Sequence, residues 1–307
     1  VWLVEDELGR EVAVKMPRAS LVDQPLALLR FERELRITAR LSHPGIVTVL
    51  SRNVVHSGET CFVMPLIEGK TLRKIIRAGR TSRRQLIRHL IQASEAIAYA
   101  HSRGVIHRDI KPNNIMVGQY GETIVIDWGL ACVNSDSDED GGPDQQLPIL
   151  EAELATKFTQ FGVGTPAYMS PEQVALSRER SQAGVGCVDH RTDVYSLGAT
   201  IYAALTGRNP FSGSDDQQLL ARVTTGDFPN PRSLDRSIPR PLEAIAQRAM
   251  SLRVEDRYQT VEALRKDLQG WLEDRPVRAM PDGPIAASSR WCRHHPPIAT
   301  IGFMMLL

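Results

Sequence analysis

The chain has 307 residues, of which 42% are hydrophobic and 24% are charged, a balance that excludes a disordered polypeptide. The formal net charge is only +1, so no overall field attracts nucleic acid, and we expect no nucleic-acid partner. The four cysteines are scattered without a CxxC pair, which argues against a disulfide framework or a zinc site and fits a reducing compartment.

The first 67 residues have the pattern of a small sheet with one helix. A polar turn containing Gly9 separates the first two β-type runs. The helix is predicted over residues 26–41, where His43-Pro44-Gly45 follows and ends it. The predicted strands cover residues 1–4, 12–15, 46–50 and 61–67.

From Thr81 onward the pattern becomes helical, with apolar residues recurring at the spacing of one helix face up to Ala100. Further helices are predicted over residues 193–205, 242–250 and 260–272, the last with Thr260 as its N-cap. A small β-rich part and a larger helical part together indicate the α+β fold class.

The most informative segment is residues 107–114, His-Arg-Asp-Ile-Lys-Pro-Asn-Asn, which carries a carboxylate, an ammonium and a carboxamide on one short loop. This set suits the transfer of a phosphoryl group held by Mg²⁺. Asp109 can orient and deprotonate a hydroxyl, Lys111 can neutralise phosphate charge, and Asn114 can ligate the metal. Asp127, thirteen residues after Asn114, offers a second hard-oxygen ligand.

With this loop and the triplet Asp127-Trp128-Gly129, the chain resembles a protein kinase, and Lys111 is typical of the Ser/Thr type. Residues 165–173, 193–198 and 205–211 resemble bacterial receptor-type kinases of the eukaryotic-like superfamily. The resemblance covers about residues 1–275. It implies a bilobal fold with an N-lobe over 1–67 and a C-lobe over 68–275. It also implies ATP and Mg²⁺ as cofactors and protein Ser/Thr hydroxyls as acceptors, including the chain's own activation loop, in signal transduction.

The resemblance assigns Lys15 to the α- and β-phosphates of ATP and Glu34 to pairing with Lys15, with Glu32 as the alternative partner. Trp128 stands where the family usually has Phe, and its aromatic ring can pack under the helix that carries Glu34. The family's Gly-rich loop is expected immediately before Val1. We interpret the chain as truncated there, and we expect weaker ATP binding without that loop.

Residues 61–67 resemble the strand that leads into the kinase hinge. Met64 is expected beside the adenine as the gatekeeper, and the Ile67 N–H is expected to donate to a ring nitrogen. Pro65 stands where the family usually has Glu; it lacks an N–H, but this position needs only the carbonyl to accept from the adenine amino group. The residues expected to enclose the adenine are Val1, Ala13 and Met116.

On the substrate side, the resemblance implies a buried ion pair between Glu172 and Arg257 beneath a peptide platform. Asp193 is expected to anchor the backbone of the catalytic loop around Arg108. Thr165 is expected to hydrogen-bond with Asp109 and Lys111.

Arg108 directly precedes the catalytic aspartate, and such an arginine commonly docks a phosphorylated activation-loop residue. Thr159 is the first candidate for that phosphorylation and Thr156 the second. Unmodified polar residues are the alternative interpretation.

The last residues suggest a membrane connection. Residues 276–295 form a predicted basic linker, and residues 296–307 are interpreted as the start of a truncated transmembrane helix; a buried helix or a tail is the alternative. The resemblance then implies a cytoplasmic kinase domain anchored in the inner or plasma membrane, and it is compatible with homodimerisation through the N-lobe.

Two other functions are alternatives to that of an active protein kinase. A catalytically silent pseudokinase scaffold is the main alternative, and the presence of Lys15, Asp109, Asn114 and Asp127 argues against it. A small-molecule kinase such as an antibiotic phosphotransferase is less consistent with the platform over residues 164–172 and its predicted ion pair.

Overall fold

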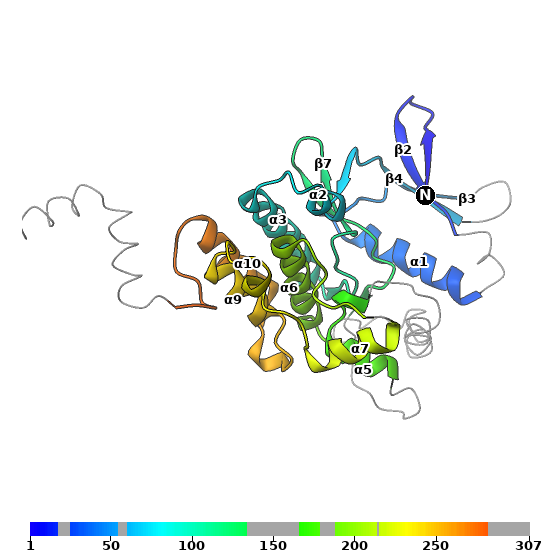
Figure 1. The fold of residues 1–307 in the computed structure, drawn as a ribbon. Coiled ribbons are helices and arrows are strands. Elements are labelled where there is room, and N and C mark those ends of the chain that lie inside the picture. The colour runs from blue at the N-terminus through cyan, green and yellow to red at the C-terminus, as the bar shows by residue number, and fades with distance from the viewer. Residues whose placement is uncertain (18–24, 55–59, 134–165, 179–187, 214, 282–307) are drawn as a thin grey trace, which may run out of the picture.

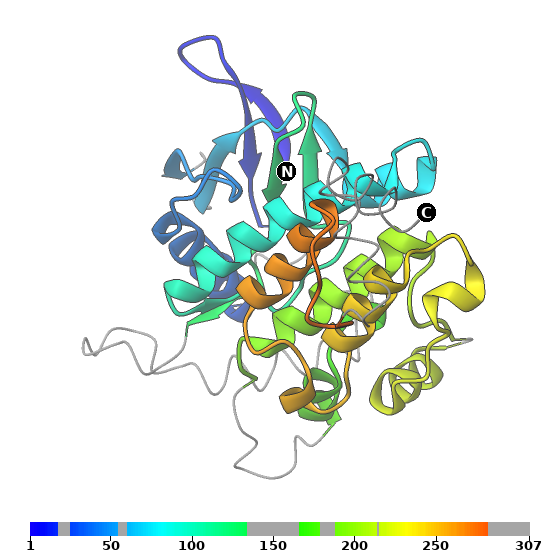
Figure 2. The same ribbon diagram turned by 90° about the vertical axis from the view of Figure 1, so that its left-hand side faces the viewer.

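The computed structural model describes residues 1–17, 25–54, 60–133, 166–178, 188–213 and 215–281. A small part with most of the long strands and helix α1 (Pro25–Arg40) lies beside a larger part built mainly of helices (Figures 1 and 2). The predicted α+β fold class is confirmed. The two parts meet at the segments that carry the candidate site.

The N-terminal sheet holds helix α1 against one face. Its four strands are antiparallel in the order β1-β2-β4-β3. They are β1 (Trp2–Glu5), β2 (Glu11–Lys15), β3 (Ser51–Val54) and β4 (Thr60–Pro65). Lys15 lies opposite Phe62 in the register, and the ring of Phe62 packs 5.1 Å from that of Phe31 on α1. The strand that carries Lys15 and the helix are therefore fixed relative to each other.

The strand predicted over residues 46–50 is wrong in position, because β3 begins only at Ser51. Ile46 instead forms an isolated parallel bridge with Val125, and Ile46 and Val47 are buried in the main core. The first half of this apolar run packs toward the larger part of the molecule, whereas Val49 packs against the cluster of Phe31, Leu35 and Phe62. Hydrophobic periodicity alone does not distinguish such a run from a sheet strand.

The larger part is built around helix α6 (Arg191–Thr206), which is buried along almost its whole length. Helix α3 (Arg83–Ser102) packs on α6 and α10, and α9 packs on α6. The other helices are α2 (Leu72–Ala78), α5 (Pro171–Arg178), α7 (Asp216–Thr225), α8 (Pro231–Leu234), α9 (Arg240–Ala249) and α10 (Val261–Leu272), with the 3-10 turns η4 (Pro166–Tyr168) and η5 (Val254–Asp256). The helices predicted over 193–205, 242–250 and 260–272 are confirmed within two residues at each end, and Thr260 caps α10.

Five short strands position the loops of the candidate site. They are β5 (Gly69–Thr71), β6 (Val105–Ile106), β7 (Ile115–Gly118), β8 (Thr123–Val125) and β9 (Cys132–Val133). They form a three-stranded sheet in the order β5-β7-β8 and a two-stranded sheet of β6 and β9. The loop over 107–114 therefore joins β6 to β7, and Asp127 follows β8. The predicted lobe boundary after residue 67 falls in the connection between β4 and β5.

The segment after α10 folds back onto that helix. The Asp267 carboxylate accepts hydrogen bonds from the backbone N–H groups of Arg278 and Ala279, each at 2.9 Å. The predicted linker over 276–295 thus begins as a docked turn. Among the helices of the described residues, none combines the length and apolarity needed to cross a bilayer. The predicted membrane segment over 296–307 lies outside these residues.

Candidate active site

The Asp109 carboxylate is the centre of a compact polar group between β6 and β7. Lys111 Nζ donates to its two oxygens at 2.9 and 2.7 Å. Asn114 Nδ2 donates to Asp109 Oδ2 and to the Asp109 backbone oxygen, both at 2.9 Å. Burial raises the pKa of Asp109, and the Lys111 ammonium opposes that rise. The Lys111 and Asn114 side chains, which the sequence groups with Asp109, both contact it directly.

The oxygen atoms near this group are suitable ligands for Mg²⁺. Because Asn114 Nδ2 makes both bonds to Asp109, the amide oxygen of Asn114 points the other way and can accept. The Asp127 side chain is about half exposed. Amide and carboxylate oxygens are the hard ligands that Mg²⁺ prefers, usually with water and phosphate oxygens completing its shell.

Lys15 joins the strand, the helix and the Asp127 segment. Its Nζ forms an ion pair with Glu34 of α1 and lies 3.4 Å from Asp127 Oδ1. Burial acts to lower the pKa of Lys15, but the carboxylates of Glu34 and Asp127 outweigh it, so the pKa is raised and the ammonium form is held. Glu32 instead pairs with Arg52 at 3.2 Å on the exposed side of α1. The structure thus selects Glu34 as the partner of Lys15.

The triplet after β8 packs closely beneath α1. A Cβ atom at Gly129 would approach Glu34 Oε2 to 3.3 Å, so glycine permits this close packing. Trp128 is buried in the cluster that includes Ile37 of α1, and its ring lies 4.5 Å from that of His107. The Trp128 Nε1 is buried without an acceptor among the described residues, which destabilises by about 1–3 kcal/mol. Tryptophan therefore fills this site less favourably than its apolar surface alone would indicate.

Asp193 on α6 is fully buried and holds the backbone at the start of the catalytic loop. Its two oxygens accept from the N–H groups of His107 and Arg108, each at 2.8 Å, and one also lies 2.7 Å from His101 Nε2. Arg108 has a φ of +67°, a left-handed conformation that costs about 1–2 kcal/mol for such a side chain. The Asp193 carboxylate offsets this strain and so sets the direction of the chain that enters Asp109.

We expect Asp193→Asn to lower the free energy of unfolding by about 3 kcal/mol at pH 7, because the amide NH₂ would face a backbone N–H. Burial raises the pKa of Asp193, but hydrogen bonds from His101 and the backbone outweigh it, and the pKa is lowered. Because the pKa of Asp193 is lower in the folded chain than in the unfolded chain, the carboxylate stabilises the fold at pH values above its unfolded pKa of about 3.9. This stability is lost as the pH falls through the pKa of Asp193 in the folded chain.

Urea unfolding of both proteins across this pH range measures the difference, which should be constant near neutrality and shrink below about pH 4. Asp256→Asn, at a carboxylate whose side chain is 62% exposed, is the control. If the two substitutions destabilise equally, the anchoring role of Asp193 is wrong.

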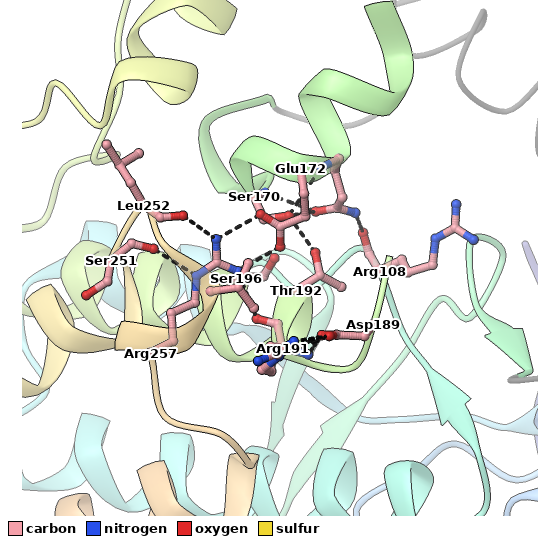
Figure 3. Close-up of polar contacts among 12 residues, drawn as sticks. Arg108, Ser170, Glu172, Asp189, Arg191, Thr192, Ser196, Ser251, Leu252 and Arg257 are labelled. Carbon is pink, nitrogen blue, oxygen red and sulfur yellow. Dashed lines mark hydrogen bonds and ion pairs between the residues drawn. The ribbon is translucent and has the colours of Figure 1, made fainter. Parts of the chain in front are cut away.

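Glu172 of α5 and Arg257 form the ion pair expected beneath the substrate platform, and Figure 3 shows them facing each other. The two guanidinium nitrogens Nη1 and Nη2 donate to the two carboxylate oxygens at 2.7 and 2.8 Å. The remaining N–H groups donate to the backbone oxygens of Ser251, Leu252 and Arg191. All five donors of a side chain with no exposed surface are therefore used.

Residues 2–268 match the family model described as the protein kinase domain. The chain belongs to the protein kinase family. It is 34% identical over 287 residues to the serine/threonine-protein kinase PknD of Protochlamydia amoebophila, covering 87% of this chain and 28% of that protein. It is 32% identical to PknD of Chlamydia pneumoniae, and the match covers 100% of this chain and 33% of that protein. It is 34% identical to the serine/threonine-protein kinase PknB of Mycobacterium leprae, and that match covers 87% of this chain and 40% of the relative. The chain thus spans well under half of these curated relatives.

The residues expected from the kinase resemblance to contact adenine come from four segments of the structure. Ala13 lies directly opposite Met64 in the register of β2 and β4. The other members are Val1, which is 77% exposed, Pro65 at the end of β4, Ile67 in the following connection, and Met116 on β7. The candidate phosphorylation sites Thr159 and Thr156 lie outside the described residues, as does Thr165, which was expected to contact Asp109.

Two polar residues that support the loop over 107–114 were not predicted from the sequence. Gln173 Nε2 donates to the backbone oxygen of Arg108 at 2.8 Å, which ties the platform to the loop. His101 supports Asp193, as described above. Gln173 directly follows Glu172 in sequence, which was an available signal, whereas nothing in the sequence around His101 indicated its partner.

Proposed function

We propose that this chain transfers the γ-phosphate of ATP to Ser or Thr hydroxyls of proteins. The contact group of Asp109, Lys111 and Asn114 supports this most strongly. The Asp127 carboxylate, which lies beside Lys15, is near enough to add to the burial that raises the pKa of Asp109. This proximity supports a single site for the nucleotide and the acceptor.

The proposed transfer needs one proton acceptor and several positive charges. The oxygen of the acceptor hydroxyl attacks the γ-phosphorus, and Asp109 takes the proton of that hydroxyl. The bond between the γ-phosphorus and the oxygen that bridges it to the β-phosphate breaks, and ADP leaves. Lys111 stabilises charge on the transferring group, and Lys15, held by Glu34, binds the α- and β-phosphates. Bound Mg²⁺ would neutralise phosphate charge, with Asn114 and Asp127 as its protein ligands.

The acceptors and the wider role rest on the resemblance to kinases. Lys111 and the names of the relatives support Ser and Thr as acceptors. We extend the proposal to signal transduction, to self-phosphorylation first at Thr159 and second at Thr156, and to docking of that phosphate by Arg108. The same resemblance supports a cytoplasmic domain attached to a membrane and association of two copies through the N-lobe.

The test is incubation of the chain with Mg-ATP and a generic protein substrate, followed by intact mass measurement and mapping of the modified residues. Phosphate on Ser and Thr is the expected result. If neither protein gains phosphate and ATP is not consumed, the scaffold function takes the place of the kinase function.

Glu34→Gln should weaken the binding of Mg-ATP about tenfold, because a neutral amide no longer holds the Lys15 ammonium toward the phosphates. Calorimetric titration with a non-hydrolysable ATP analogue measures this effect. Glu32→Gln is the matched control on the same helix, since its partner Arg52 is exposed, and it should change the affinity less than twofold. Equal weakening by the two substitutions would contradict the role of Glu34.

A further inference from the structure

A cavity of about 300 Å³ lies between α2, the connection from α6 to α7, and α8. Helices α2 (cyan) and α8 (yellow) lie on the right-hand side of the molecule in Figure 2. Three arginines contribute to the cavity wall: Arg73, Arg208 and Arg222. No Asp or Glu is found among the described residues that line it. The cavity is therefore strongly basic.

The cavity wall is fastened to both sides of the candidate active site. The backbone N–H of Arg73 donates to the oxygen of Pro112 in the catalytic loop at 3.0 Å. The Arg73 guanidinium donates to Asn209 Oδ1 at 2.6 Å and to the Tyr168 hydroxyl at 3.3 Å. Tyr168 belongs to η4 and lies within residues 164–172, the segment predicted to form the platform. The cavity therefore lies next to both the catalytic loop and the predicted platform, within reach of residues that flank a bound acceptor.

Most of the positive charge in the wall is not neutralised. The partners of the Arg73 guanidinium are neutral groups. Arg208 is exposed, and its guanidinium has no hydrogen bond or ion pair with any described residue. Arg222 donates to the backbone oxygens of Ser212 and Asp227 and pairs at 3.0 Å with the Asp227 carboxylate, whose side chain is 69% exposed. Of the three guanidinium groups, only that of Arg222 has a carboxylate partner among the described residues, and that carboxylate is solvated, which favours binding of an anion.

We propose that this cavity binds an acidic or phosphorylated side chain that flanks the Ser or Thr acceptor of a protein substrate. The proposal rests on the proposed kinase function and specifies its substrate class. Guanidinium groups bind carboxylates and phosphates through paired, charge-assisted hydrogen bonds. Because Arg73 is fixed by Asn209 and Tyr168, part of the geometry is set before the substrate arrives, while Arg208 is available to close on it.

The test measures binding of fluorescent peptides to the full chain by anisotropy. The first peptide has a single Ser with Glu residues on both sides. The second has Gln in place of every Glu, and the third has phosphoserine in place of every Glu. The Glu peptide should bind at least about tenfold more tightly than the Gln peptide. The phosphoserine peptide distinguishes the two anionic classes, since tighter binding than the Glu peptide assigns the cavity to phosphorylated substrates.

Substitutions then locate the preference. Arg208→Glu should abolish the difference between the Glu and Gln peptides, and Arg208→Lys should retain most of it because the charge remains. Arg88→Glu is the charge-matched control at an exposed position on α3, where the residue lines a different surface hollow, and it should leave the preference unchanged. Equal binding of Glu and Gln peptides, or equal loss in the Arg208→Glu and Arg88→Glu variants, overturns the proposal.

Peptide binding does not depend on phosphate transfer, so the two proposals fail separately. If the Gln peptide is phosphorylated as fast as the Glu peptide and binds as tightly, the kinase function stands and the substrate preference is wrong. If no peptide is phosphorylated while Arg208-dependent selectivity for Glu persists, the cavity binds acidic peptides and the kinase function is wrong.

Discussion

Asp109→Asn is expected to lower the rate of phosphate transfer about 10²- to 10⁴-fold while the chain remains folded. The amide has nearly the shape of the carboxylate, but it cannot accept the proton of the attacking hydroxyl. It also leaves the Lys111 ammonium without the charge that holds it at 2.7 Å. Both losses act on the transfer step, so the affinity for Mg-ATP should change only about twofold.

Initial rates of phosphate incorporation and calorimetric titration with an ATP analogue separate these two effects. Asp256→Asn, at an exposed carboxylate on η5, should leave both quantities unchanged. Thermal unfolding of Asp109→Asn shows whether its loss of rate comes from unfolding. A folded variant that retains more than about a tenth of the wild-type rate would contradict the role of Asp109 as proton acceptor.

The sequence predicted this group well because its members are close together in the chain. Asp109, Lys111 and Asn114 lie within six residues, and a loop of that length can hardly separate them. The pairing of Lys15 with Glu34 was different, since two glutamates on one helix were candidates and only their orientation toward the sheet distinguishes them. The resemblance to the family led to the prediction of Glu34 rather than Glu32. The physical reason is that Glu34 points toward Lys15, whereas Glu32 points toward Arg52.

Other contacts could not be predicted, because they join residues that are far apart in sequence and have ordinary types. Gln173 binds Arg108 across 65 residues, and Arg73 binds Asn209 across 136. Polar side chains of these kinds are usually solvated, so their type gives no signal. The strands β5 to β9 have only two to four residues, too short for hydrophobic alternation to identify them. Tertiary packing determines these features.

Glu172→Ala is expected to lower the free energy of unfolding by about 3–5 kcal/mol, although its side chain is 28% exposed. The reason lies in its partner, because the Arg257 side chain has no exposed surface and its other donors already bind backbone oxygens. Removing the carboxylate leaves a buried positive charge that water cannot readily reach. The ring of Tyr195, 4.9 Å from the guanidinium, offers only weak compensation.

Urea unfolding at pH 7 measures the effect, and a nearby exposed pair provides the control. Glu255 contacts Arg253 at 2.7 Å, with side chains 60% and 73% exposed, so Glu255→Ala should cost at most about 1 kcal/mol. The two pairs have similar contact distances and differ mainly in burial. A large loss for Glu172→Ala alone would therefore show that desolvation of the arginine, rather than the contact itself, determines the energy. Equal losses would mean that Arg257 becomes hydrated or shifts when its partner is removed, and that the platform does not depend on this pair.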